Sequence, residues 1–123
     1  MSDSTTTMLQ LRDFVSDFVN ARDWQQFHSP KNLSMALAIE VAELMEHFQW
    51  LTTDASRNVG EDPQVISAVR EELADVMCYA LAIANELNID VSAAMREKMR
   101  KNELKYPAEE YRGRYGPQDT GSS

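Results

Sequence analysis

Two dipeptides divide this chain into long uninterrupted segments. Ser29-Pro30 and Asp62-Pro63 each place a helix-capping side chain directly before a proline, and proline is favoured at the first position of a helix. Few other breaks occur, because the 123 residues include only 4 Gly and 4 Pro. We therefore expect one helix over residues 30–50 and another over 63–88, the second roughly 39 Å long.

Two further helices flank this pair. Thr7 and Gln10 have the spacing of a capping box, and the helix that follows carries an apolar face of Leu11, Phe14, Val15, Phe18 and Val19. Asp90 caps another helix, which should stop at Tyr106 because Pro107 disfavours helical geometry in the residue before it. No segment has the pattern of a strand. The sequence thus predicts an all-α chain with one four-helix domain over residues 7–112 and disordered ends at 1–6 and 113–123.

Acidic residues outnumber basic ones, with 20 Asp plus Glu against 12 Lys plus Arg and a formal net charge of -8. Proteins that bind polymeric nucleic acid use basic surfaces that displace counterions from phosphates, so this balance argues against such a partner. A free triphosphate remains compatible, provided that a divalent cation lies between its phosphates and the carboxylates.

The chain shows neither a signal-peptide pattern nor an apolar run near the roughly 20 residues that span a bilayer. We therefore expect a cytoplasmic protein without a membrane partner. The helix predicted over 63–88 is apolar on more than one side, which is typical of a helix buried all round. A protomer this small cannot bury it alone. We expect a homo-oligomer, a tetramer with a dimer as the alternative, in which the single cysteine, Cys78, is a small buried residue without a redox role.

Carboxylates occupy positions that the helical period assigns to the core. The apolar stripe of the helix over 30–50 is Leu33, Leu37, Glu40 and Leu44, and that of the helix over 63–88 is Val65, Val69, Glu72, Val76 and Ile83. Glu43 follows Glu40 by one turn, as Asp75 follows Glu72. Four carboxylates close together in apolar surroundings repel one another and require a cation. Oxygen ligands on facing helices suit Mg²⁺ or Mn²⁺.

Two other interpretations compete with a magnesium site. One is a solvated face with ordinary salt bridges, which is the usual environment of a helical Glu, although both pairs are in phase with core stripes. The other is a carboxylate-bridged di-iron centre, which needs Glu-x-x-His twice. The chain has only His28 and His47, and His47 lies four residues after Glu43, so a di-iron centre is disfavoured.

The acid pairs resemble a known family. Glu40-x-x-Glu43 followed by Glu72-x-x-Asp75, in an all-helical chain, is similar to the MazG-like nucleoside triphosphate pyrophosphohydrolases of the all-α type. Three further segments resemble the dCTP pyrophosphatase branch of that family: Arg22 to Leu33, Phe48-Gln49-Trp50 and Lys105-Tyr106-Pro107. The similarity runs from Leu9 to Tyr111.

The resemblance implies a four-helix MazG-like bundle, completed by oligomerisation, that hydrolyses a nucleoside triphosphate to the monophosphate and pyrophosphate with Mg²⁺. By position it assigns the metal to Glu40, Glu43, Glu72 and Asp75. Glu43 is our candidate general base, with Glu46 as a helper one turn further along. The residues implied in binding the base, sugar and phosphates are Trp24, Phe27, Lys31, Trp50, Tyr79, Lys98, Asn102, Lys105 and Tyr106.

The sequence therefore favours a pyrophosphohydrolase acting on dCTP or a modified pyrimidine deoxynucleotide, which would cleanse the nucleotide pool. Hydrolysis of dUTP or phosphoribosyl-ATP is the alternative within the same class. A non-catalytic helical oligomerisation or metal-sensing module is the alternative from another class, although a scaffold has no need to keep four acids in core register. The base preference, the number of metal ions and the identity of the general base stay open.

Overall fold

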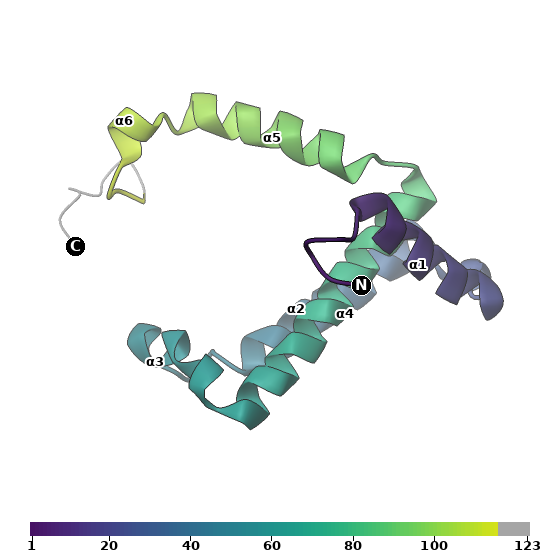
Figure 1. The fold of residues 1–123 in the computed structure, drawn as a ribbon, viewed down its shortest axis with the longest axis horizontal. Helices are drawn as coiled ribbons and strands as arrows, with labels where there is room; N and C mark the ends of the chain where they lie inside the picture. Colours follow the sequence, from purple (N-terminus) through teal and green to yellow (C-terminus); the bar gives the residue numbers. More distant parts are fainter. Residues whose placement is uncertain (116–123) are drawn as a thin grey trace. The chain divides into compact units, whose positions relative to one another are not determined.

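The computed structural model describes residues 1–115 and contains helices and turns, with no strand among these residues. The predicted all-α class is therefore confirmed. The chain forms two compact units, Met1–Asn88 and Ile89–Ser123, of which the first holds three long helices (Figure 1). Most of the tail predicted to be disordered, residues 116–123, lies outside the described part of the chain.

The long helices of the first unit begin where their capping residues predict. Helix α1 (Met8–Ala21) follows the complete capping box of Thr7 and Gln10. Helix α2 (Pro30–Glu46) follows Ser29, whose hydroxyl accepts the amide N–H of Asn32. Helix α4 (Pro63–Leu87) follows Asp62, whose carboxylate accepts two amide N–H groups of the first turn. A capping side chain needs only neighbours along the chain, so local sequence suffices to locate it.

The end predicted for the second helix is wrong. Helix α2 ends at Glu46, and residues 47–50 form turns in which the amide N–H of Phe48 donates to Met45 O at 2.9 Å. Aromatic side chains lose more freedom in a helix than straight-chain ones, and Thr52 caps a new short helix, α3 (Thr53–Arg57). This helix and the 3₁₀ turn Val59–Glu61 were not predicted, because no glycine or proline occurs in residues 47–58, where α2 gives way to them.

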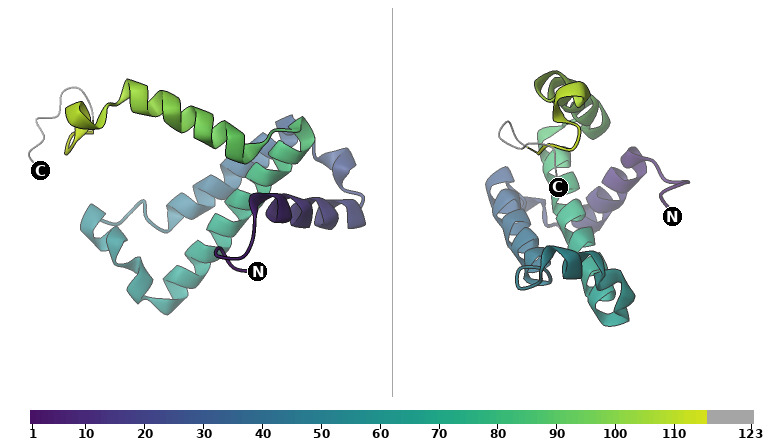
Figure 2. Two further views of the ribbon diagram at one scale, coloured as in Figure 1. Left: turned by 45° about the horizontal axis from the view of Figure 1, so that its top comes forward. Right: turned by 90° about the vertical axis from the view of Figure 1, so that its left-hand side faces the viewer.

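Helix α4 passes between α1 and α2 (Figure 2), and its contact with α2 is the most extensive in the molecule. The buried apolar side chains of the described residues lie along these contacts: Val19, Leu33, Leu81, Ala82 and Ala84. A polar clamp joins α1 to α4, since the Arg12 guanidinium donates to Asn85 Oδ1 and Ala84 O while Asn85 Nδ2 donates to Arg12 O. The positions of the carboxylates on α2 and α4 follow from this packing.

Many large apolar side chains remain exposed in the single chain. They include Met35, Ile39 and Met45 on α2 and Leu73 and Met77 on α4, each 44% to 59% exposed. Cys78 is exposed as well, so its predicted burial requires a partner chain. None of the helices in residues 1–115 combines the length and the apolar character needed to cross a membrane.

The second unit contains helix α5 (Val91–Lys105) and the short helix α6 (Ala108–Tyr111). Asp90 caps α5 by accepting the amide N–H of Ala93, and the helix stops at Tyr106 before Pro107, as predicted. The rings of Tyr106 and Tyr111 pack edge to face with centroids 5.2 Å apart.

Candidate functional site

Three of the four predicted carboxylates form one cluster. Glu40 and Glu43 project from α2 and Glu72 from α4, and one carboxylate oxygen of each lies within 4.8 Å of the others. Residues three apart share a helical face. The α2–α4 contact that buries Leu33 brings the two faces together. The structure thus brings the pair Glu40-x-x-Glu43 beside Glu72 of the second predicted pair.

Burial makes this cluster electrostatically unfavourable without a cation. Glu40 and Glu72 are half-buried, and the Oε2 atom of each is shielded from solvent without a hydrogen-bond partner. Burial raises the pKa of Glu40 to about 7, with further contributions from the carboxyl groups of Glu43, Glu72 and Asp75. The pKa of Glu72 is also raised, first by burial and then by Glu43, while the carboxyl group of Glu40 acts in the opposite direction.

The donor set fits a hard divalent cation. Within Met1–Asn88 no Lys or Arg forms an ion pair with the cluster, and the ion pair found in this unit, Arg57–Asp54, is exposed. Three carboxylates with two orphaned buried oxygens offer the all-oxygen coordination that Mg²⁺ and Mn²⁺ prefer.

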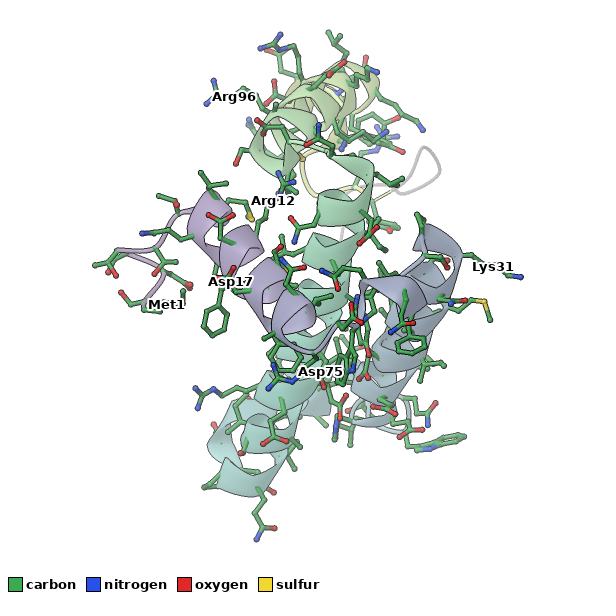
Figure 3. All side chains as sticks on the ribbon, turned by 90° about the vertical axis from the view of Figure 1, so that its right-hand side faces the viewer. Met1, Arg12, Asp17, Lys31, Asp75 and Arg96 are labelled. Atoms are coloured by element: carbon green, nitrogen blue, oxygen red, sulfur yellow. The ribbon has the colours of Figure 1, made fainter. Side chains whose placement is uncertain are left out.

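Two predicted acids lie outside the cluster. Asp75, labelled in Figure 3, is one helical turn beyond Glu72 on α4 and lines a neighbouring groove. Its charge still helps to raise the pKa of Glu40 and Glu72. Glu46 is exposed at the last position of α2. The structure thus groups Glu40, Glu43 and Glu72, and the roles predicted for Asp75 and Glu46 stay predictions.

An aromatic groove of about 340 Å³ lies between α1 and α4 next to Asp75. Its lining residues are Phe14, Val15, Phe18, Val19, Trp24, His28, Asp75, Cys78, Tyr79 and Ala82. Trp24 and Tyr79 were predicted to bind the base, and the structure brings both to this groove. Phe27 is 59% and Trp50 88% exposed, and neither lines the groove. The role of Phe27 and Trp50 in binding the base stays a prediction.

Sequence reasoning missed Phe14, Phe18, His28 and Cys78 as groove residues. Phe14 and Phe18 were assigned to the core face of the first helix, but they are 64% and 48% exposed. The helical period identifies an apolar stripe and does not distinguish its buried centre from its open edge. His28 was expected at a helix entry or an oligomer contact, and Cys78 in a subunit interface. Partial burial and the charge of Asp75 raise the pKa of the Cys78 thiol, which disfavours the reactive thiolate.

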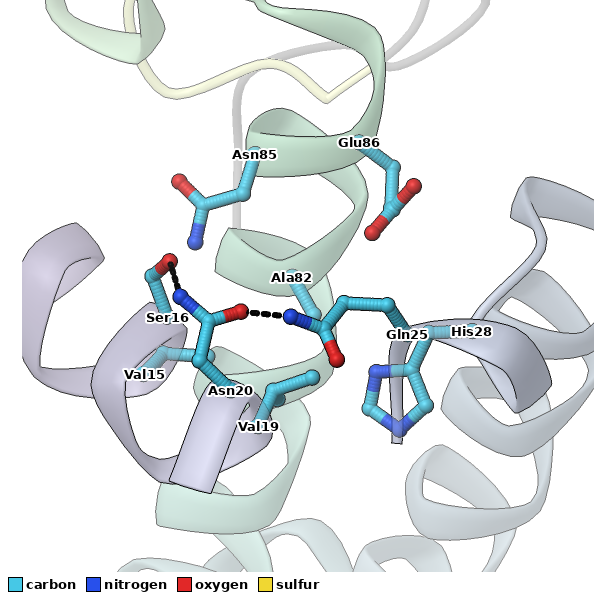
Figure 4. A pocket seen from close by; sticks show the side chains of 9 residues that line it. All are labelled: Val15, Ser16, Val19, Asn20, Gln25, His28, Ala82, Asn85 and Glu86. Carbon is cyan, nitrogen blue, oxygen red and sulfur yellow. Dashed lines mark hydrogen bonds between the residues drawn. The ribbon is translucent and has the colours of Figure 1, made fainter. Parts of the chain in front are cut away.

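A small polar cavity of about 30 Å³ adjoins the groove and shares Val15, Val19, His28 and Ala82 with it (Figure 4). Asn20 links two of its polar side chains, because its amide donates to Ser16 Oγ and its carbonyl accepts from Gln25 Nε2. A space of this size holds about one water molecule. The cavity is therefore too small for a nucleotide.

The predicted phosphate and sugar contacts lie elsewhere in the chain. Lys31 is exposed in the first turn of α2, and its side chain extends away from α4 (Figure 3). The other four residues belong to the second unit, on or directly after α5: Lys98, Asn102, Lys105 and Tyr106. The Lys105 ammonium lies 5.3 Å from the centroid of the Tyr106 ring. Their roles toward a nucleotide stay predictions.

Comparison with known proteins identifies the family. Residues 35–115 match the profile of the MazG-like family, and this segment contains all the predicted metal ligands. This chain belongs to the MazG-like family. It is 41% identical over 102 residues to human dCTP pyrophosphatase 1 and 38% identical over 107 residues to the rat protein of that name. These matches cover 83% and 87% of this chain but 60% and 63% of the relatives' own lengths.

A solved structure shares the MazG-like fold of this chain. The crystal structure of a pyrophosphatase from Archaeoglobus fulgidus superimposes with a TM-score of 0.76 at 39% sequence identity. The match covers 87% of this chain and 98% of the archaeal one. The predicted MazG-like architecture is thus confirmed, whereas completion of the bundle by oligomerisation is not tested.

Proposed function

We propose that this protein is a Mg²⁺-dependent nucleoside triphosphate pyrophosphohydrolase of the cytoplasmic nucleotide pool. The observation that carries the proposal is the cluster of Glu40, Glu43 and Glu72, whose buried oxygens lack partners, beside an aromatic groove. The proposed substrate is dCTP or a modified pyrimidine deoxynucleotide, and the products are the monophosphate and pyrophosphate. The relatives named dCTP pyrophosphatase 1 support this choice of substrate.

In the proposed mechanism the carboxylates have two tasks. Glu40, Glu43 and Glu72, with Asp75, would hold the metal, which would neutralise phosphate charge and lower the pKa of the attacking water. Water attacks the α-phosphorus, the bond to the bridging oxygen breaks, and pyrophosphate leaves. Glu43 accepts the proton of the water, and Glu46 assists from the next turn.

The groove would bind the base. Trp24 and Tyr79 line it, and stacking of a flat base on such side chains is worth roughly 1–3 kcal/mol in single-strand binders. We assign Phe27 and Trp50 to the same task. Contacts to the sugar and the phosphates are proposed for Lys31, Lys98, Asn102, Lys105 and Tyr106.

We further propose a homotetramer, with a dimer as the alternative. The exposed apolar side chains of α2 and α4 form surfaces that a single chain leaves in contact with water, and burial of such surfaces drives association. Light scattering at micromolar concentration tests this assembly, and a monomer mass would contradict it.

The catalytic proposal is tested by incubating the purified protein with Mg²⁺ and a panel of triphosphates that includes dCTP, 5-substituted dCTP, dUTP and phosphoribosyl-ATP. We expect pyrophosphate from dCTP or its modified forms. Orthophosphate alone, or no release from any compound, would refute the proposal, and preference for dUTP or phosphoribosyl-ATP would change the substrate.

Glu43→Gln separates catalysis from folding. We expect the variant to keep its helicity and assembly but to lose turnover, whereas Glu61→Gln, an exposed acid outside the cluster, should behave as wild type. Unchanged turnover would remove Glu43 from the mechanism. If wild type and both variants assemble but release no pyrophosphate, the alternative of a non-catalytic helical oligomerisation module is favoured.

A further inference from the structure

Arg22 contacts two aromatic walls of the groove. Its guanidinium carbon lies 3.7 Å from the centroid of the Phe18 ring and 6.0 Å from that of Trp24. The two rings meet edge to face at 5.7 Å. Nη1 of Arg22 also donates to Phe18 O at 3.1 Å. One planar cation thus contacts both rings and is anchored to the last turns of α1.

The backbone orients Trp24 only in part. After α1 the chain turns through Asp23, which has a left-handed φ of 53°, and the amide N–H of Trp24 donates to Val19 O at 3.1 Å. This hydrogen-bonded helix end resembles a Schellman motif and places the Trp24 Cα, but the backbone by itself does not fix the orientation of the ring. Phe18 and Trp24 are 48% and 42% exposed, so packing on one side alone would not hold their rings.

We propose that Arg22 is a positioning residue: its guanidinium holds the Phe18 and Trp24 rings in the orientation that lines the groove, and so strengthens binding of a flat base there. A guanidinium suits this task because it is planar, stacks on aromatic faces and keeps directional N–H donors at its edge. A Lys ammonium is a compact point charge and cannot contact both rings while it donates to Phe18 O.

Loss of this contact should affect binding and not chemistry. Where only a fraction of molecules has a binding-competent groove, the apparent affinity falls by that fraction. Given the strength of an exposed cation–π contact, we expect KM to rise about two- to fivefold. The groups that shift the pKa of Glu40 and Glu72 are other carboxyls and do not include Arg22. We therefore expect kcat to change by less than about twofold.

The experiment compares Arg22→Met and Arg22→Lys with Arg57→Met, a control at an exposed arginine of α3. Steady-state kinetics are measured in the native background. Acrylamide quenching and anisotropy of Trp24 are measured without nucleotide in a Trp50→Phe background, where Trp24 is the remaining one of the 2 tryptophans. Circular dichroism checks that each variant is folded.

We expect Arg22→Met to increase the quenching of Trp24, to lower its anisotropy and to raise KM. Arg22→Lys should restore these three values in part. Arg57→Met should match wild type. Unchanged quenching and anisotropy in Arg22→Met would overturn the proposal, as would a fall in kcat without a change in KM. The kinetic arm rests on the proposed function. If wild type releases no pyrophosphate, that function fails, and the fluorescence of Trp24 still decides whether Arg22 positions the ring.

Discussion

The raised pKa of Glu40 predicts that divalent cations bind the cluster more weakly as the pH falls below 7. A carboxyl group must lose its proton to ligate a metal, so cation binding competes with protons. With a pKa of about 7, Glu40 is ionised in about 9% of molecules at pH 6 and in about 91% at pH 8. The apparent affinity for Mg²⁺ should therefore be about tenfold lower at pH 6 than at pH 8.

The same shift changes the stability of the metal-free protein. The pKa of Glu40 in the folded state lies above its ordinary value of 4.5, so the folded state binds the proton more tightly than the unfolded chain. The protonated Glu40 carboxyl group therefore stabilises the folded state below about pH 4.5, and this contribution to the free energy of unfolding is lost as the pH rises through about 7. Glu72 acts in the same direction. The Tm of the metal-free protein should fall between pH 5 and pH 8.

Calorimetric titration with MgCl₂ at pH 6, 7 and 8, in two buffers of different ionisation enthalpy, measures both affinity and proton release. We expect about half a proton released from Glu40 at pH 7. Thermal unfolding of metal-free wild type, Glu40→Gln and the control Glu61→Gln measures stability. Glu40→Gln should flatten the pH dependence of Tm and weaken Mg²⁺ binding, while the control does neither. Equal Mg²⁺ affinity at pH 6 and pH 8, without proton release, would refute the reasoning.

Three predictions concern the scaffold, each measured by denaturant unfolding. Asp62→Ala removes the cap of α4 and should lower the free energy of unfolding by about 1 kcal/mol; no loss would mean that the cap hydrogen bonds are not needed. Leu33→Ala removes most of the one fully buried large side chain of the described residues and should lower the free energy of unfolding by about 3 kcal/mol. A loss below about 1 kcal/mol would contradict tight α2–α4 packing. At Asp23, where φ is 53°, Gly should stabilise by about 0.5 kcal/mol and Val destabilise; equal stability of both would argue against a left-handed residue there.

Helix starts were predictable because capping is local. Thr7, Ser29, Asp62 and Asp90 each accept amide N–H groups two or three residues ahead, and all four helices begin where these residues predict. The end of α2 was not predictable in the same way. No glycine or proline occurs in residues 47–58, so the end of α2 at Glu46 has no helix-breaking residue beside it.

The structure brings part of the predicted carboxylate set together. Periodicity placed Glu40, Glu43 and Glu72 on facing helical stripes, and the structure joins them in one cluster. Asp75 has the same spacing from Glu72 as Glu43 has from Glu40, yet it lies in the groove and not in the cluster. Sequence spacing gives the face of a helix but not the rotation of that helix against its neighbour, and this rotation decides which carboxylate reaches the cluster.

The sequence by itself determined the helical class, the starts of the helices and the faces that carry carboxylates, because capping and periodicity act over a few residues. Only the tertiary structure decided that Phe14, Phe18 and Trp24 form one wall of a groove and that Asp75 and Tyr79 of α4 complete its lining. These features depend on the distance and rotation between packed helices, which are set by contacts between residues far apart in the chain.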